Sequence, residues 1–374
     1  MDFALSDEQR MLRDAAREFL GNRSNSEAVR AVMETEAGFD PALWTEMAGL
    51  GWQAMAVPEE YGGAGFTVLE LGIILEEMGR ALTPAPFLSS VVLGANTLLL
   101  AGTEEQKREL LPAVAAGERR LAAAFIEPDG SWDPEDLTTT ATAAGPDVVV
   151  TGTKSFVVDG HSADTLIVAA RNEAGSIDLY LVDSENSGVA ASPLETMDMT
   201  RKQATVSFNS VRLPASARVG DSGSGAITIA RLYDLAVVAL AFEQVGGAER
   251  CMEMSVAYAK ERYQFGRPIG SFQAVKHKCA DMLVAVEGAR SAAYYAGWTA
   301  SVADDDLPVV AALAKAYCSD AFFDVAAETI QVHGGIGFTW EHDAHLYFKR
   351  AKTSQLMFGD SAEWRAKLAS RIGL

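Results

Sequence analysis

The sequence predicts an α+β chain in three parts: an all-helical N-terminal region, a small β region and a C-terminal helical bundle. Apolar residues recur at helical spacing up to about residue 118, and short β-rich runs separated by turn formers follow. Helical periodicity then returns and continues to the end of the chain. A length of 374 residues suits two to three domains. We predict domains at 1–118, 119–220 and 221–374.

Helix-start signals support the first part. Ser6 is followed three residues later by Gln9, and Thr103 is followed by Gln106, which is the spacing of a capping box. Between these starts, apolar spacing predicts further helices over 43–50, 69–82 and 88–100.

Short runs of β-forming residues mark the middle part. Gly, Asp and Pro turns separate them, which predicts a small barrel or sandwich. The expected strands are Val148–Val150, Ser155–Val158, Leu166–Ala169, Leu179–Val182 and Ala204–Phe208, with Thr138–Ala144 as another candidate.

Four long periodic segments with short connections make up the third part. They predict an antiparallel four-helix bundle. The segments are Ala226–Arg262, Ser271–Val302, Pro308–His333 and Asp343–Met357.

Composition and charge limit the kinds of ligand that the chain can bind and indicate its cellular compartment. The net charge of −20 argues against nucleic acid as a binding partner. It also repels anionic ligands at long range, so such a ligand must be bound by local donors in its site. Three scattered cysteines read as buried thiols in a reducing compartment. The N-terminus has no signal-peptide pattern, and the apolar run Leu235–Phe242 is too short to span a bilayer. We expect a cytoplasmic protein without a membrane span.

The most informative motif is R-Y-Q-F-G-R-P-I-G-S-F-Q-A-V-K-H-K-C-A-D-M at 262–282. It resembles the C-terminal-domain signature of the acyl-CoA dehydrogenase family, and this resemblance covers essentially the whole chain. The resemblance implies FAD as cofactor, an acyl-CoA thioester as substrate, dehydrogenation to the 2,3-enoyl-CoA, and an electron-transfer flavoprotein as acceptor. By the same resemblance, Arg262 binds the FAD diphosphate, Phe265 packs near the adenosine part, and Gln273 hydrogen-bonds to FAD.

A second string, Q-V-H-G-G-I-G-F-T-W-E at 331–341, follows about 70 residues later, as in the family. Its glycines allow close backbone approach to a ligand. By resemblance, Gln331, Gly334 and Gly335 contact FAD bound in a neighbouring subunit. This implies a homo- or hetero-oligomer, a dimer or tetramer of similar chains. A third stretch, 50–65, resembles the family's N-terminal loop, and the following helix, which carries Glu76 and Glu77, resembles the helix that lines the acyl pocket.

The β region departs from the family pattern. In F-I-E-P-D-G-S-W-D at 125–133, Ile126 replaces the usual threonine, and Ser131 is the nearest candidate for the usual substrate-contacting serine. In K-S-F-V-V-D-G at 154–160, Phe156 can stack on a flavin ring, but Val158 has no hydroxyl to donate. Arg201 is a candidate contact to the acyl-CoA or to a domain interface.

The usual catalytic glutamate is missing. The reaction needs a carboxylate with a raised pKa in an apolar pocket. The family string Y-E-G-T aligns with M-F-G-D, which puts Phe358 at the glutamate position, and the alternative family position falls on Ala236. Asp360 and Glu243 are the substitute candidates. Each also has a structural interpretation: Asp360 as a helix N-cap and Glu243 as a buried hydrogen-bonding group.

Nearby polar residues receive structural interpretations. His333, His342 and His345 lack metal-site spacing and read as loop and helix-surface residues. Glu341 and Arg350 suggest an ion pair or a helix-end contact.

Three alternatives to a self-sufficient dehydrogenase stay open at this point. One is a non-catalytic partner subunit of a heteromeric acyl-CoA dehydrogenase that supplies FAD contacts in trans. Another is a flavin oxidase or monooxygenase on the same fold. The third is a CoA-thioester-binding protein without redox chemistry.

Overall fold

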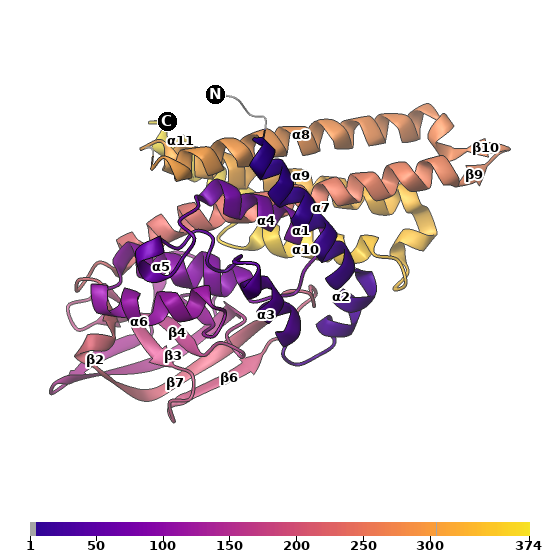
Figure 1. Ribbon diagram of the computed structural model, residues 1–374. Coiled ribbons are helices and arrows are strands. Elements are labelled where there is room, and N and C mark those ends of the chain that lie inside the picture. The colour runs from indigo at the N-terminus through magenta and orange to yellow at the C-terminus, as the bar shows by residue number, and fades with distance from the viewer. Residues whose placement is uncertain (1–4, 304) are drawn as a thin grey trace. The chain divides into compact units, whose positions relative to one another are not determined.

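The computed structural model describes residues 5–303 and 305–374, which form two compact units. The helical unit comprises residues 5–30, 68–83 and 237–374, and the sheet unit comprises 31–67 and 84–236 (Figure 1). Residues 1–4, which open the segment used for the signal-peptide prediction, lie outside the described residues.

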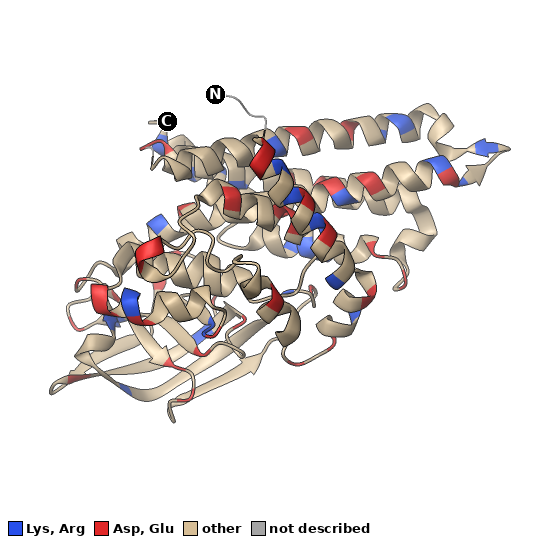
Figure 2. Cartoon of the chain, viewed as in Figure 1, with Lys and Arg blue, Asp and Glu red and all other residues tan. Residues whose placement is uncertain are grey.

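Long helices dominate the helical unit. Its elements are α1 (Asp7–Arg23), the start of α2 (Ser26–Met33), α4 (Val68–Arg80), most of α7 (Gly225–Glu261), β9 (Tyr263–Gln264), β10 (Arg267–Pro268), η5 (Ile269–Ser271), α8 (Gln273–Ser301), α9 (Leu307–His333), η6 (Gly334–Phe338), α10 (Ala344–Leu356) and α11 (Ser361–Arg371). The capping box predicted at Ser6 and Gln9 is confirmed at the start of α1. Acidic and basic residues are interspersed along α1 (Figure 2).

The sheet unit combines short helices with eight strands. Its helices are the end of α2, α3 (Pro41–Gly49), η1 (Glu59–Tyr61), the π-helix η2 (Leu88–Ala95), α5 (Asn96–Ala101), α6 (Glu104–Ala115), η3 (Pro134–Asp136), η4 (Ala215–Ala217) and the start of α7. Its strands are β1 (Leu121–Ala124), β2 (Thr140–Ala144), β3 (Asp147–Val158), β4 (Thr165–Asn172), β5 (Ile177–Asp183), β6 (Val189–Pro193), β7 (Gln203–Pro214) and β8 (Arg218–Val219).

The strands form one sheet in the order β6-β7-β3-β2-β4-β5-β8, with β1 pairing in parallel to β4. Alternating side chains of these strands make a buried apolar cluster. Two register shifts interrupt the β3–β7 pairing, at Val150/Gly152 and at Lys154/Val157. The second shift matters for the site because a β-bulge re-aims the side chains around it.

Helix α4 crosses α7 at very short range within the helical unit. A Cβ atom added to Gly246 would lie 1.8 Å from the backbone oxygen of Glu76, and one added to Gly79 would lie 2.0 Å from the backbone oxygen of Glu243. Glycine at both positions therefore lets the two backbones touch.

Helix α7 is longer and more apolar than the run Leu235–Phe242 indicated. By length and composition alone it could cross a membrane, but 72% of its apolar window is buried inside the protein, as in the core helix of a bundle. The run Leu235–Phe242 is therefore only part of a longer apolar stretch.

The predicted order of helices, sheet and helices is confirmed, and the described chain has the α+β class expected. The domain boundaries at 118 and 220 stay a prediction. The sequence missed α2, β1, β6 and β8, and it divided the continuous strand β3 into two runs.

Candidate functional site

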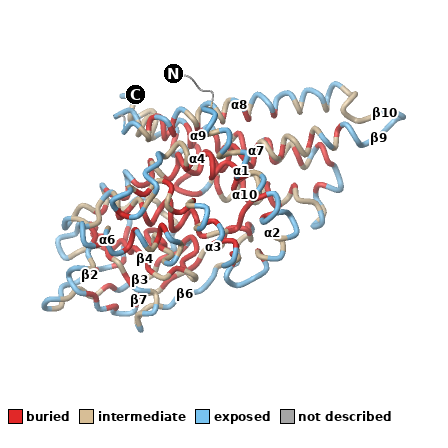
Figure 3. Tube along the Cα trace, viewed as in Figure 1, coloured by how far each residue is buried: buried red, intermediate tan, exposed pale blue. Residues whose placement is uncertain are grey.

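The hairpin β9–β10 presents the first predicted cofactor residues in the helical unit. Arg262 follows the end of α7, Phe265 occupies the hairpin turn, and Gln273 opens α8. All three are exposed; Phe265 is 91% exposed and has φ +53°. Figure 3 shows the exposed hairpin clearly. A phenylalanine held in the left-handed region with an exposed ring is typical of a binding surface rather than of a core.

An aromatic stack joins this region to the glycine string. Tyr258, one turn before Arg262, stacks on His333 with ring centroids 4.5 Å apart. His333 is the last residue of α9 and directly precedes Gly334. The two strings that the sequence linked only by resemblance therefore lie next to each other in the helical unit.

The glycine string leaves its backbone open. Gly334 has φ +63°, and a Cβ atom at Gly334 or Gly335 would meet no atom within 4 Å. Gln331 is exposed on the last turn of α9. This open backbone fits the close approach of a bulky cofactor.

His333 itself is buried, so the prediction that it lies on the surface is wrong. Its Nδ1 lies 2.8 Å from the backbone oxygen of Thr329, and its ring lies 4.4 Å from that of His342. Burial lowers the pKa of His333. A neutral ring in this stack fits a structural role. Within residues 5–303 and 305–374, no group of three or more His, Cys, Asp or Glu side chains is placed to hold a metal ion.

The sheet unit brings Ile126 and Phe156 together. The backbone N–H of Ser155 donates to the carbonyl of Ile126 at 2.9 Å, at the bulge of β3. Phe156 has φ +55° and is 40% exposed, whereas Ile126 and Val158 are buried. The bulge therefore turns one aromatic ring outward beside an apolar edge, as stacking on a flat ligand requires.

A buried ion pair fixes this edge. Lys154 is fully buried, and its Nζ donates to Glu127 Oε1 at 2.9 Å and to the carbonyl of Phe125 at 3.2 Å. Glu127 also accepts backbone hydrogen bonds from Thr138 and Thr139. Glu127 and Lys154 lie in the two strings 125–133 and 154–160, but the sequence did not show that they pair.

Glu127 predicts an acid-dependent loss of stability. Burial opposes its charge, but hydrogen bonds from Thr138 and Thr139 and the Lys154 charge outweigh burial and lower its pKa from 4.5 to about 2. The stabilisation is therefore complete above pH 4.5 and is lost as pH falls toward 2. Burial lowers the pKa of Lys154 to about 8, so Lys154 stays charged throughout this range.

We expect Glu127→Gln to lower the free energy of unfolding by about 3 kcal/mol at pH 6, and this difference from the wild type to shrink toward pH 2. Urea denaturation across this pH range, followed by circular dichroism, measures it. A difference that does not change with pH would contradict the assignment.

The two residues predicted to contact substrate, Ser131 and Arg201, lie in the sheet unit and have contacts within the protein. The hydroxyl of Ser131 donates to Asp136 Oδ2 at 2.5 Å and accepts from the backbone of Asp133 at 3.2 Å. Arg201 is buried. Their predicted roles toward substrate stay predictions.

The loop between α10 and α11 carries Phe358, the residue that the sequence strings align with the usual family glutamate. Phe358 is 3% exposed with φ +63°, and its carbonyl accepts from Trp364 Nε1 at 2.8 Å. On the other side, the buried Lys315 Nζ donates to the carbonyls of Ser354 and Gln355 at 2.6 and 3.1 Å. Hydrogen bonds thus hold both ends of the loop in place, and the ring of Phe358 is buried.

Asp360 caps helix α11. Its Oδ1 accepts from the backbone N–H groups of Ala362 and Glu363 at 2.8 and 2.9 Å, and the Glu363 side chain accepts from the Asp360 N–H at 2.8 Å. This reciprocal pair is a capping box. It favours the structural interpretation of Asp360.

We expect Asp360→Ala to lower the free energy of unfolding by about 1 kcal/mol and Asp360→Asn to change it much less, because asparagine keeps the acceptor. Both variants should retain flavin reduction by substrate in the assembled enzyme. Loss of flavin reduction in Asp360→Asn, with stability unchanged, would make Asp360 the base instead.

Glu243 is held by a buried arginine. Arg350 Nη1 lies 2.9 Å from Glu243 Oε1, between α10 and α7, and both side chains are buried. The sequence pointed to Glu341 as the partner of Arg350, but the structure pairs Arg350 with Glu243. This buried pair occupies the carboxylate and favours the structural interpretation of Glu243.

Glu76 and Glu77 belong to an ion-pair network within the helical unit. Glu76 is buried, forms an ion pair with Arg290 and accepts from the Tyr294 hydroxyl at 2.8 Å. Glu77 takes two hydrogen bonds from Arg17, at 2.7 and 2.9 Å. Burial raises the pKa of Glu76, although Arg290 opposes it. These contacts tie α4 to α1 and α8.

Comparisons with known proteins agree with this geometry. Profiles of the acyl-CoA dehydrogenase N-terminal, middle and C-terminal domains match residues 6–118, 122–211 and 223–373. The acyl-CoA dehydrogenase IpdE2 of Mycolicibacterium smegmatis is 36% identical, over 98% of this chain and 100% of its own length.

Two solved structures extend the likeness. Butyryl-CoA dehydrogenase from Megasphaera elsdenii superposes with TM-score 0.91 at 28% identity, covering 100% of both chains. A chain of the ChsE4–ChsE5 complex from Mycobacterium tuberculosis gives TM-score 0.91 at 30% identity, covering 100% of this chain and 99% of that one. The chain therefore belongs to the acyl-CoA dehydrogenase family, FAD-dependent oxidoreductases that act on acyl-CoA thioesters.

Proposed function

We propose that this chain is a subunit of an FAD-dependent acyl-CoA dehydrogenase that contributes contacts to FAD but does not supply the catalytic base. The loop Met357–Asp360 carries the proposal. Its phenylalanine, which the sequence strings align with the usual glutamate, is buried, and its aspartate caps α11. The remaining candidate, Glu243, is held by Arg350.

The FAD contacts of this chain would come mainly from the helical unit. Arg262 offers a planar fork suited to a pyrophosphate, and Gln273 and Gln331 offer amide groups. Their exposure, and the open backbone at Gly334 and Gly335, support contact with a cofactor that a neighbouring chain helps to hold.

The sheet unit would give the flavin ring an apolar face rather than hydrogen bonds. Phe156 is exposed enough to stack on it, but Ile126 and Val158 have no polar side-chain atoms. When bound, FAD would supply the acceptor for the hydride that leaves the β-carbon of the thioester. This chain would position the cofactor while another chain removes the α-proton.

The missing base favours a hetero-oligomer. In a homo-oligomer every subunit would carry the same buried phenylalanine. The similar chain in the ChsE4–ChsE5 structure belongs, by the name of that structure, to a complex of two different proteins. We propose a dimer or tetramer with a homologous chain, an acyl-CoA thioester as substrate and an electron-transfer flavoprotein as acceptor. The three free cysteines support a cytoplasmic location.

The test is the flavin content of the chain purified alone and after co-expression with a homologous chain. We expect little bound flavin in the chain alone and stoichiometric FAD in the co-purified complex, with reduction by acyl-CoA. Stoichiometric FAD in the chain alone, bleached by acyl-CoA, would contradict the proposal. Oxygen consumption with substrate would favour an oxidase instead.

Arg262→Ala should lower FAD retention by the complex about ten-fold or more, since a charged hydrogen bond to phosphate is lost. Arg262→Lys keeps the charge but not the fork, and should fall between Ala and the wild type. Ultrafiltration with a fluorescence assay of released FAD measures both. Unchanged retention in Arg262→Ala would refute the role of this arginine.

A further inference from the structure

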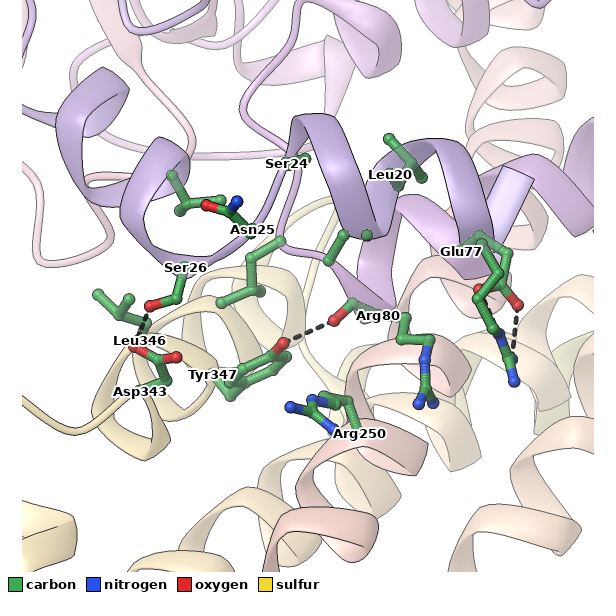
Figure 4. A pocket seen from close by; sticks show the side chains of 15 residues that line it. Leu20, Ser24, Asn25, Ser26, Glu77, Arg80, Arg250, Asp343, Leu346 and Tyr347 are labelled. Atoms are coloured by element: carbon green, nitrogen blue, oxygen red, sulfur yellow. Dashed lines mark hydrogen bonds and ion pairs between the residues drawn. The ribbon is translucent and has the colours of Figure 1, made fainter. Parts of the chain in front are cut away.

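A cavity of about 290 Å³ lies within the helical unit, among α1, α2, α4, α7 and α10. Figure 4 shows the end of α1 and the start of α2 on one side, with Tyr347 and Arg250 across from them. None of the residues that we propose to contact FAD lines this cavity. It is therefore a separate place in the fold.

The floor of the cavity is apolar. The buried side chains of Leu20, Val29, Leu82 and Leu346 line it. The hydroxyl of Tyr347 is already used, because it donates to the carbonyl of Arg80 at 2.6 Å. The volume equals about ten water molecules at roughly 30 Å³ each. This size and lining suit a short hydrocarbon body.

Several charged residues of the wall already have partners. Glu77 is bound by Arg17 through two hydrogen bonds, and Arg80 donates to Glu249 at 3.1 Å. Asp343 accepts a hydrogen bond from the Ser26 hydroxyl at 2.6 Å and another from Arg30 at 2.8 Å. These groups would have to break existing pairs to bind a ligand.

Within the described residues, two other polar groups of the wall have no hydrogen-bond partner or only a long ion pair. Ser24 is 3% exposed, and its Oγ finds no hydrogen-bond partner anywhere in residues 5–303 and 305–374. The Arg250 side chain is 43% exposed, and its ion pair with Glu253 is long, at 3.6 Å. A buried hydroxyl without a partner is costly, and a guanidinium has several donors to offer.

We propose that this cavity binds a small carboxylic acid in its ionised form. The carboxylate pairs with the Arg250 guanidinium, the Ser24 hydroxyl offers a further donor in the wall, and the hydrocarbon body lies on the apolar floor. A carboxylate matches the planar fork of arginine. A doubly charged phosphate is less suitable because Glu77 and Asp343 stand in the same wall.

Gly21 provides a sharp test. It lies in the last turns of α1, it lines the cavity, and a Cβ atom added there would meet no atom within 4 Å. Gly21→Leu should therefore fill the cavity without a clash, and a non-glycine residue favours a helix. Gly49→Leu is the matched control, since Gly49 ends α3 in the sheet unit and its Cβ position is equally open.

The probe is hexanoate, titrated calorimetrically into the purified full chain, with hexylammonium and hexyl phosphate as comparisons. We expect one hexanoate site per chain with a dissociation constant in the millimolar range or below. Arg250→Gln should weaken binding about ten-fold or more, and Gly21→Leu should abolish it. Gly49→Leu and Arg365→Gln, which removes a positive charge away from the cavity, should bind as the wild type does.

Three results would overturn the proposal. The first is hexanoate binding that persists in Gly21→Leu, which would place it elsewhere in the chain. The second is equal binding of hexylammonium, which would remove the role of Arg250. The third is no heat with hexanoate at millimolar concentration. Circular dichroism of each variant separates a lost site from a lost fold.

Discussion

Arg350→Met is expected to lower the free energy of unfolding by about 3–5 kcal/mol, because it leaves the Glu243 carboxylate buried without its cation. Both side chains are buried, and the pair joins α10 to α7 at 2.9 Å. Urea unfolding at neutral pH, followed by circular dichroism, measures the change.

The double variant Glu243→Met with Arg350→Met is the control. Replacing both charges by apolar side chains of similar size should recover most of the lost stability. If Arg350→Met alone cost less than about 1 kcal/mol, the pair would resemble an exposed ion pair, and Glu243 would return as a candidate base.

Gly246→Ala should be the most damaging conservative change in the helical unit. The new methyl group would lie 1.8 Å from the backbone oxygen of Glu76, so α4 and α7 would have to separate. We expect a net loss of about 3 kcal/mol, since backbone atoms cannot rotate away as a side chain can. Thermal and urea unfolding of the purified chain measure it.

Gly49→Ala is the matched control for that change. Its Cβ position has no atom within 4 Å, so alanine should be neutral or should stabilise by up to about 1 kcal/mol. A similar loss of stability in both variants would mean that the close helix crossing does not explain the effect.

Local chemistry explains which elements the sequence could predict. The capping boxes at Ser6 and at Thr103 were predicted because a cap depends on residues three positions apart. Strand β1 was missed because its sequence is Leu-Ala-Ala-Ala, which has little β propensity. Its pairing with β4 fixes it as a strand, and that pairing spans more than 40 residues of sequence.

The same difference between local signals and long-range contacts applies to the candidate site. Arg262 and Gln331 were singled out by their strings, and the stack of Tyr258 on His333 then placed those strings side by side. The partner of Glu243 lies 107 residues away, on another helix, so only the fold could reveal it. The positive φ values of Phe156, Phe265 and Phe358 were equally hidden, because they depend on the turns around them.

We propose that this chain contributes contacts to FAD without supplying the base. The most direct measurement is anaerobic reduction of flavin by acyl-CoA, in the chain alone saturated with excess FAD and in the co-purified complex. A thioester that bleaches the complex is then offered to the chain alone. We predict no bleaching of the chain alone. Bleaching there with the same thioester would contradict the account.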